Sequence, residues 1–129
     1  MEAPPHKKVL IVDDEKEMLL LFSARLQREG YVVDVAFDAM GALTKAVRTR
    51  PDCILMDIMM PAGGGMGLLE NIRNNSDTFS IPVIVMTASV DPKYKKGAER
   101  LGVSGYLLKP FEASQMLEKI KDVIGASTS

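Results

Sequence analysis

The stretch at residues 9–14 reads Val9-Leu10-Ile11-Val12-Asp13-Asp14, a short apolar run that ends in two acidic residues. Three later runs have the same form: Cys53-Ile54-Leu55-Met56 precedes Asp57, Val83-Ile84-Val85-Met86 precedes Thr87, and Tyr106-Leu107-Leu108 precedes Lys109. Short continuous apolar runs of this kind are typical of buried strands in a parallel sheet. If these runs are neighbouring strands, three carboxylates, a hydroxyl and an ammonium meet at one edge of the sheet. That combination indicates a site for a divalent cation and a phosphoryl group.

The length and charge of the chain indicate one domain with a protein or small-molecule partner. A chain of 129 residues has the usual size of a single domain. Its 16 basic and 17 acidic residues nearly balance, which argues against direct binding to nucleic acid or to a membrane surface. No apolar run approaches the roughly 18 residues of a membrane span, and no signal peptide is evident, so we expect a cytoplasmic protein. The single cysteine, Cys53, offers neither a disulfide nor a zinc site on its own.

Helical periodicity between the apolar runs predicts alternating strands and helices, the pattern of an α/β fold with a parallel sheet covered on both faces. Further strands are expected at residues 32–36 and 103–108. Helices are expected at residues 16–29, from the cap Asp38 to Pro51, through Leu68, Leu69 and Ile72, from the cap Asp91 to Gly102, and around residues 116–124. Pro61 and Gly63-Gly64-Gly65 predict a loop. We expect a short flexible N-terminal tail at residues 1–7, one domain at 8–125 and a C-terminal tail at 126–129.

The three acidic residues at the strand ends have a simpler explanation when each is taken alone. Asp13 and Asp14 could serve only to cap the following helix, and Asp57 could be a turn residue. Two adjacent carboxylates point in different directions, however, so one can bind a cation while the other holds a metal-bound water, which suits Mg²⁺. Asp57 adds a third negative charge that a cation or Lys109 would have to offset. Because all three carboxylates follow strands of one predicted sheet, a common cation site is favoured over separate roles in a cap and a turn.

Thr87 and Lys109 also have ordinary alternatives, as a strand residue and as a surface ion-pair partner. At the sheet edge, the Thr87 hydroxyl could instead donate to a phosphoryl oxygen. Lys109 stands between an apolar strand and Pro110, whose peptide bond can adopt the cis form and turn the side chain over the edge. The sequence leaves the isomer of that bond open.

Four motifs in order carry a resemblance to a known family. They are Val-Asp-Asp-Glu at 12–15, Met-Asp-Ile-Met-Met-Pro at 56–61 with Gly65, Met-Thr-Ala at 86–88, and Tyr-Leu-Leu-Lys-Pro-Phe at 106–111. With these motifs the chain resembles the receiver domain of bacterial two-component response regulators, and it is similar in length to the stand-alone chemotaxis type. The resemblance extends from residue 8 to about residue 124. Each motif alone is weak, but the set at this spacing is specific.

The resemblance implies a flavodoxin-like doubly wound (βα)5 fold whose sheet has the order 2-1-3-4-5. Asp57 would be the phosphoacceptor, taking a phosphoryl group from the phosphohistidine of a sensor histidine kinase or a histidine phosphotransfer protein. Mg²⁺ would be bound by Asp14, Asp57 and the backbone carbonyl of Met59, while Asp13 would hold a metal-bound water. The acyl phosphate would act as a signal, so the chain would not be an enzyme with an outside substrate.

Other residues would carry the signal from the phosphoryl group. Lys109 would contact one phosphoryl oxygen, and Thr87 would move to another while Tyr106 turned inward. This movement would change the face formed by the fourth helix, the fifth strand and the fifth helix, which would then bind an unknown downstream protein. Ala88 would leave room for a bulky donor, and Pro110 would have a structural role. The chain could be a monomer or a phosphorylation-dependent dimer.

Three other classes of protein fit these residues less well. A small Mg²⁺-dependent phosphohydrolase with an aspartyl nucleophile needs a second Asp two residues later, where this chain has Met59. A flavin-binding protein needs a phosphate-cradling loop where Asp13 and Asp14 stand, and these acids would repel the phosphate. A histidine kinase is excluded because the only histidine, His6, lies in a tail beside proline.

Some positions depart from the common pattern of the family. The loop after Pro61 is rich in glycine, which predicts a mobile edge beside Asp57. Met59 and Ser89 occupy positions that tune phosphoryl lifetime, and an apolar Met59 predicts slow self-dephosphorylation. The apolar turn Met18-Leu19-Leu20-Leu21-Phe22 exceeds what a helix on a sheet can bury. We expect some of Met18, Leu21 and Phe22 to stay exposed and dock against the kinase.

Overall fold

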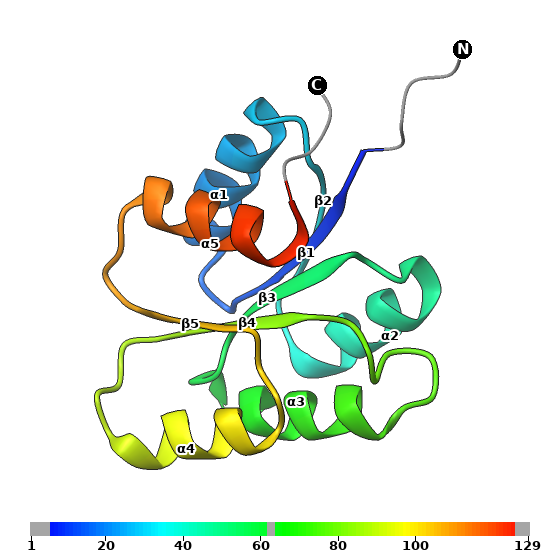
Figure 1. The fold of residues 1–129 in the computed structure, drawn as a ribbon, viewed down its shortest axis with the longest axis vertical. Helices are drawn as coiled ribbons and strands as arrows, with labels where there is room; N and C mark the ends of the chain where they lie inside the picture. Colours follow the sequence, from blue (N-terminus) through cyan, green and yellow to red (C-terminus); the bar gives the residue numbers. More distant parts are fainter. Residues whose placement is uncertain (1–5, 62–63, 126–129) are drawn as a thin grey trace.

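The computed structural model describes residues 6–61 and 64–125, in which a parallel sheet is covered by helices on both faces (Figure 1). The strands are β1 (Lys8–Val12), β2 (Val32–Ala36), β3 (Cys53–Asp57), β4 (Val83–Thr87) and β5 (Gly105–Leu108). Neighbouring strands are parallel throughout, in the order β2-β1-β3-β4-β5. The predicted α/β class and the strand order implied by the resemblance are confirmed.

The helices alternate with the strands along the chain. They are α1 (Lys16–Arg28), α2 (Ala39–Thr49), α3 (Gly64–Asn74), α4 (Pro92–Arg100) and α5 (Ala113–Ile124). Figure 1 shows α1 and α5 on one face of the sheet and α2, α3 and α4 on the other. Two predicted caps are present: Asp38 Oδ1 accepts a hydrogen bond from Gly41 N at 2.7 Å, and Asp91 Oδ1 accepts one from Lys93 N at 3.0 Å. Each cap satisfies an N–H group that the first turn leaves unpaired.

The apolar strand residues form two core layers, one on each face of the sheet. Along β1, Val9 and Ile11 pack with α1 and α5, whereas Leu10 and Val12 pack with α2 and α3. The same alternation holds in β3 and β4, whose residues are all buried. Side chains alternate between the faces of a strand, so a strand buried on both faces must be apolar throughout. The continuous runs in the sequence are thus explained.

The structure corrects the predicted loop at the glycine run, because Gly64 and Gly65 belong to the first turn of α3. The reason is a close approach between the start of this helix and the chain that leaves β3. A Cβ atom at Gly65 would lie only 2.3 Å from the carbonyl oxygen of Ile58. Glycine is therefore needed there for packing rather than for a turn. Gly63 lies outside the described residues, as does part of the edge that was predicted to be mobile.

Two smaller differences concern the segment between α4 and β5. The fifth strand begins at Gly105 and not at residue 103. Val103 is instead bonded to the end of α4, since its N–H donates to the carbonyl of Ala98 at 3.3 Å. Gly102, at the predicted helix end, has a φ of 71°, a left-handed conformation that favours glycine.

The apolar turn of α1 is divided between the core and the surface. Phe22 is 3% exposed and stacks on Phe111, with 5.2 Å between the ring centroids. Met18 is half-buried, whereas Leu20 and Leu21 are 73% and 62% exposed. The prediction that some of Met18, Leu21 and Phe22 stay exposed is confirmed through Leu21, while Phe22 belongs to the core. Leu20 was not predicted to be exposed.

Residues 1–5 of the predicted N-terminal tail and the whole predicted C-terminal tail, 126–129, lie outside the described residues. In the ranges 6–61 and 64–125, no helix is both long enough and apolar enough to span a membrane.

Candidate functional site

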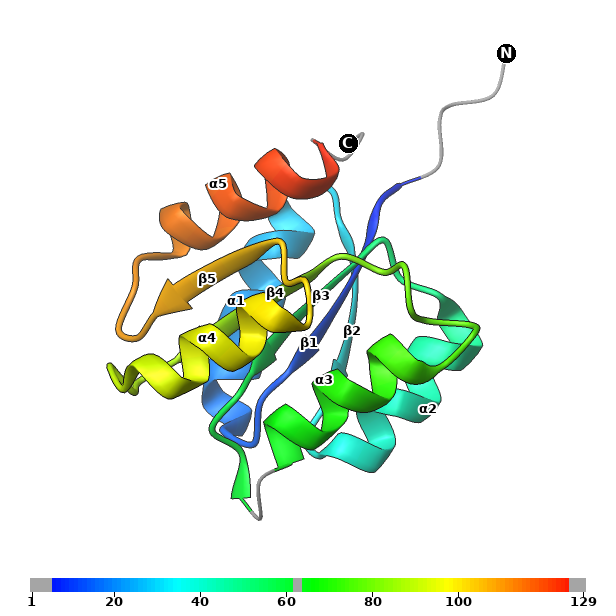
Figure 2. The same ribbon diagram turned by 60° about the horizontal axis from the view of Figure 1, so that its bottom comes forward.

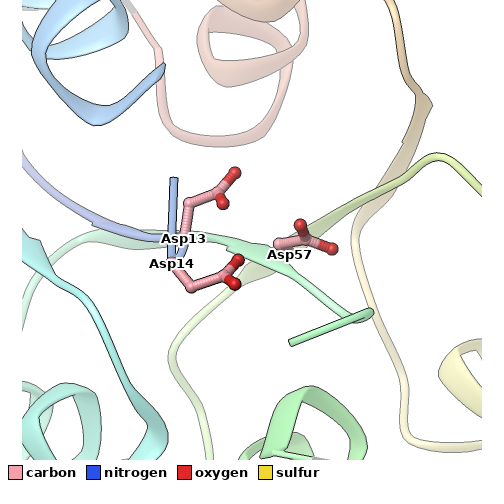
Figure 3. Close-up of side chains that lie close together, drawn as sticks. All are labelled: Asp13, Asp14 and Asp57. Carbon is pink, nitrogen blue, oxygen red and sulfur yellow. The ribbon is translucent and has the colours of Figure 1, made fainter. Parts of the chain in front are cut away.

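The reactive groups predicted from the sequence lie at the carboxyl ends of the strands. Asp13 follows β1, Asp57 ends β3, Thr87 ends β4, and Lys109 follows β5. Carboxylate oxygens of Asp13, Asp14 and Asp57 lie within 4.8 Å of one another, and Figure 3 shows these side chains gathered at the sheet edge. The order β2-β1-β3 places the edge at the point where the chain reverses its direction of winding, where open α/β sheets bind ligands.

Asp13 is fully buried and fixed through both of its oxygens. Oδ2 accepts a hydrogen bond from Lys109 Nζ at 2.8 Å, and Oδ1 accepts one from Glu15 N at 3.0 Å. This carboxylate therefore holds the backbone of Glu15, just before helix α1, and also holds the lysine. Asp14 next to it is exposed, and its side chain projects toward Asp57 (Figure 3). The pair is thus split between a buried, bonded carboxylate and an accessible one.

Asp57 is 5% exposed and also has both oxygens engaged. Oδ2 accepts from Lys109 Nζ at 2.9 Å, and Oδ1 accepts from Met59 N at 2.7 Å. Beyond the strand, Ile58 N donates to the carbonyl of Met86 at 3.1 Å, which continues the pairing with β4 past the acidic residue. These bonds orient the carboxylate at the rim of the sheet without removing it from reach of solvent.

Lys109 joins the two buried carboxylates, and its side chain is 10% exposed. Glu15 Oε1 lies 3.7 Å from the same ammonium and adds a further negative charge, although no role was predicted for this residue from the sequence. Burial alone would lower the pKa of Lys109, but hydrogen bonds and charges of Asp13 and Asp57 outweigh this effect and raise the pKa above its usual value. The lysine is therefore charged at neutral pH. The peptide bond from Lys109 to Pro110 is cis, an isomer that the sequence had left open.

Three aspartates against one lysine leave an excess of negative charge at this edge. Carboxylate oxygens are the ligands that Mg²⁺ prefers, and an exposed carboxylate beside two buried ones allows the ion to keep several waters. The donor set therefore fits the predicted cation. The residues that could hold the ion are Asp13, Asp14 and Asp57. Met59, whose carbonyl was predicted as a further ligand, lies two residues after Asp57 in the turn that follows β3.

Thr87 and Tyr106 lie on the neighbouring strands β4 and β5. Thr87 is fully buried, and its Oγ1 accepts a hydrogen bond from Ser89 N at 3.1 Å. Tyr106 is half-buried, and burial raises the pKa of its hydroxyl. It borders a pocket of about 400 Å³ between α4 and β5, together with Val90, Lys95 and Leu108. Ala88, which was predicted to leave room for a bulky donor, is exposed.

Comparison with protein families gives a match to the response regulator receiver domain over residues 9–121. Among curated proteins, the response regulator ArlR of Staphylococcus saprophyticus is 33% identical over 117 residues, which is 91% of this chain and 52% of that protein. The alkaline phosphatase synthesis transcriptional regulatory protein PhoP of Bacillus subtilis is 33% identical over 95% of this chain and 50% of its own length. The chain thus spans about half the length of these relatives.

Two solved structures are similar over nearly their whole chains. Chemotaxis protein CheY4 of Vibrio cholerae has a TM-score of 0.86 and 33% identity, with 92% of this chain and 99% of that chain covered. The receiver domain of the sensor histidine kinase PA1611 of Pseudomonas aeruginosa has a TM-score of 0.83 and 28% identity, with 95% and 100% covered. In the latter structure a magnesium ion is coordinated in the active-site cleft.

Proposed function

Because this chain belongs to the response regulator receiver domain family, we propose that Asp57 accepts a phosphoryl group and that the acyl phosphate switches a surface for binding a protein. The observation that carries the proposal is the pair of hydrogen bonds from Lys109 to Asp13 and Asp57 beside the exposed carboxylate of Asp14. The donor would be the phosphohistidine of a sensor histidine kinase or of a histidine phosphotransfer protein.

In the transfer step, an oxygen of Asp57 attacks the phosphorus, and the N–P bond of the phosphohistidine breaks with its electron pair kept by the imidazole. Met59 N holds Oδ1 of Asp57, so this carboxylate keeps its orientation during the attack. Lys109 already lies at Oδ2, where its positive charge is next to the group that becomes more negative in the product. The protein's own contribution is therefore positioning and charge compensation.

Mg²⁺, when bound, would reduce the repulsion between the incoming phosphoryl group and the carboxylates. Asp14, Asp57 and the carbonyl of Met59 would hold the ion, and Asp13 would hold one of its waters. The arrangement supports this division, since Asp14 is exposed while Asp13 is buried and already bonded to Lys109 and Glu15 N. Each residue then has a distinct part in binding.

The signal would leave the site through Thr87 and Tyr106. A hydroxyl that moves to a phosphoryl oxygen gives up its bond to Ser89 N, and the pocket beside Tyr106 offers space for rearrangement between α4 and β5. The face formed by α4, β5 and α5 would then bind the downstream protein, as a monomer or as a phosphorylation-dependent dimer. A cytoplasmic location follows from the same family membership and is part of the proposal.

The donor protein would dock beside α1. Leu20 and Leu21 are large, exposed and on the helix that begins directly after the acidic pair, so they can contact a helix that presents its phosphohistidine to Asp57. Phosphohydrolase activity on an outside substrate is not favoured, because the side chain at position 59 is an exposed methionine that cannot act as acid or base. We therefore propose a phosphoacceptor and not an enzyme.

The proposal is tested by intact-protein mass spectrometry after incubation with acetyl phosphate. We expect one phosphoryl adduct on the parent protein and on Asp122→Asn, a control at an exposed position on α5. Asp57→Asn should give no adduct, and removal of Mg²⁺ by a chelator should abolish it on the parent. An adduct that persists on Asp57→Asn, or that does not need a divalent cation, would contradict the proposal.

A further inference from the structure

Arg73, in the last turn of α3, joins three separate segments of the chain. Its Nε donates to the carbonyl of Leu101 at 2.7 Å, and its Nη2 donates to that of Gly102 at 3.3 Å. Its Nη1 donates to the carbonyls of Ile81 at 2.8 Å and Phe79 at 3.1 Å, both just before β4. One guanidinium thus ties α3 to the end of α4 and to the chain that enters β4.

The carbonyls of Leu101 and Gly102 lie where α4 ends. A helix leaves its last carbonyls without partners inside the helix and carries partial negative charge at this end. An arginine satisfies several such acceptors at once, because its five N–H donors have a fixed planar arrangement. Ala98 near the same end is fully buried. Met66 of α3 lies against Gly97, so close that a Cβ atom at Gly97 would be 2.5 Å from its Cε. The C-terminal end of α4 is therefore firmly held.

The N-terminal end of α4 has few contacts. Lys93, Lys95 and Lys96 are exposed, and in the first turn only Tyr94 is partly buried. The pocket of about 400 Å³ lies directly beside this end and is bordered by Pro92. In Figure 2 the start of α4 lies at the outer edge of the molecule, whereas its other end leads back to the sheet. The helix is thus held unequally at its two ends.

A series of hydrogen bonds connects Thr87 to the loosely held end. Ser89 N donates to Thr87 Oγ1 at 3.1 Å, and Asp91 N donates to Ser89 Oγ at 3.1 Å. Lys93 N then donates to Asp91 Oδ1 at 3.0 Å in the first turn of α4. Each bond spans two residues, so the side chain at one step fixes the backbone at the next. A change at the Thr87 hydroxyl removes the first support of this series.

We propose that Arg73 is the pivot of α4: when Asp57 is phosphorylated, the N-terminal end of the helix swings and its C-terminal end stays in place. The inference rests on the proposed function for the trigger, since Thr87 must leave Ser89 N to reach a phosphoryl oxygen. The bonds from Thr87 through Ser89 to Asp91 start the movement at one end. Arg73 resists it at the other, so a small change at the sheet edge becomes a tilt of a surface helix.

The swing is measured as distances between spin labels with beryllofluoride and Mg²⁺ as the phosphoryl mimic. One label is placed at Ala24→Cys on α1, and the second either at Lys93→Cys or at Arg100→Cys, which are exposed and mark the two ends of α4. Cys53 is buried and stays unlabelled. We expect the distance to position 93 to change on activation and the distance to position 100 to stay constant. In Arg73→Lys, which keeps the charge but loses the planar set of donors, both distances should change.

Arg28→Lys, an exposed arginine on α1, is the matched control and should behave as the parent protein. The proposal is overturned if position 100 moves as far as position 93 in the parent, or if it remains as fixed in Arg73→Lys as in the parent. Amide hydrogen exchange without beryllofluoride tests only whether Arg73 holds the C-terminal end of α4. Arg73→Lys should speed exchange at Leu101 and Val103, and unchanged exchange there would show that Arg73 does not hold this end. If beryllofluoride does not perturb Thr87 in NMR spectra, the proposed function fails and the movement of α4 fails with it. This outcome differs from one in which Thr87 responds but Arg73 does not hold the end of α4.

Discussion

The close approach of α3 to the end of β3 makes Gly65→Ala a sharp test of how the site is positioned. The new Cβ would lie 2.3 Å from the Ile58 carbonyl oxygen and 2.5 Å from the Ile58 carbonyl carbon and Cα, whereas ordinary contacts begin near 3.4 Å. The helix start or the loop must therefore move by about 1 Å. Ile58 directly follows Asp57, and Met59 N holds the Asp57 carboxylate, so this displacement reaches the proposed phosphoacceptor.

The control for this substitution is Gly67→Ala, two residues further along the same helix, where nothing lies within 4 Å of the added Cβ. Both variants gain helix propensity, roughly 0.5–1 kcal/mol, because alanine restricts the unfolded chain. Only Gly65→Ala has the overlap, which costs about 1–3 kcal/mol. Gly67→Ala should be more stable than the parent protein, and Gly65→Ala less stable than Gly67→Ala by about the cost of the overlap.

Urea unfolding and the rate of phosphorylation by acetyl phosphate measure the two consequences. A misplacement of about 1 Å at a reacting group can slow a reaction on the order of 100-fold, so Gly65→Ala should accept the phosphoryl group much more slowly than Gly67→Ala. Equal unfolding free energies and equal rates for the two variants would refute the reasoning.

Three further predictions concern the core and the charged groups. Phe22→Ala should lower the free energy of unfolding by about 3–5 kcal/mol, whereas Leu21→Ala should change it by less than about 0.5 kcal/mol; similar losses in urea unfolding would contradict the assigned burial. Lys109→Met should destabilise the protein by about 3 kcal/mol because two buried carboxylates lose their partner, and Mg²⁺ should raise the midpoint of thermal unfolding more in this variant than in the parent. Burial, assisted by the charge of Asp52, raises the pKa of Cys53 from 9.0 to about 12, so the folded state holds this proton more tightly and stability should fall as the pH rises from 9.0 toward about 12. Cys53→Ala should show a smaller loss of stability over that range, and an unchanged slope would contradict this assignment.

Most of the architecture was predictable because the strands are buried on both faces. Such strands must be apolar throughout, so they stand out from the chain, and the first polar group after each marks the edge of the sheet. The residues Asp13, Asp57 and Lys109 came together for this reason, and their mutual hydrogen bonds follow from charge and proximity. Parallel strand ends meet whatever the details of helix packing are.

The remaining features depend on contacts between distant parts of the chain. Five consecutive apolar residues do not show which side of α1 faces the sheet. Only the packing of the helix shows that Phe22 is buried and that Leu20 is not. The glycine run resembles a turn, and the need for Gly65 appears only when α3 lies against Ile58. Arg73 looks like an ordinary polar residue at a helix end until Leu101, 28 residues later, returns to its side. Each of these outcomes is set by tertiary packing and not by local pattern.

The proposed function requires that Asp57, and no neighbouring carboxylate, carries the phosphoryl group. Reduction of the phosphorylated protein with borohydride converts an aspartyl phosphate to homoserine, and peptide sequencing by mass spectrometry then locates the changed residue. We expect homoserine at position 57 alone, formed only when Mg²⁺ was present during phosphorylation. Homoserine at Asp13 or Asp14, or a phosphoryl adduct that resists reduction, would contradict it.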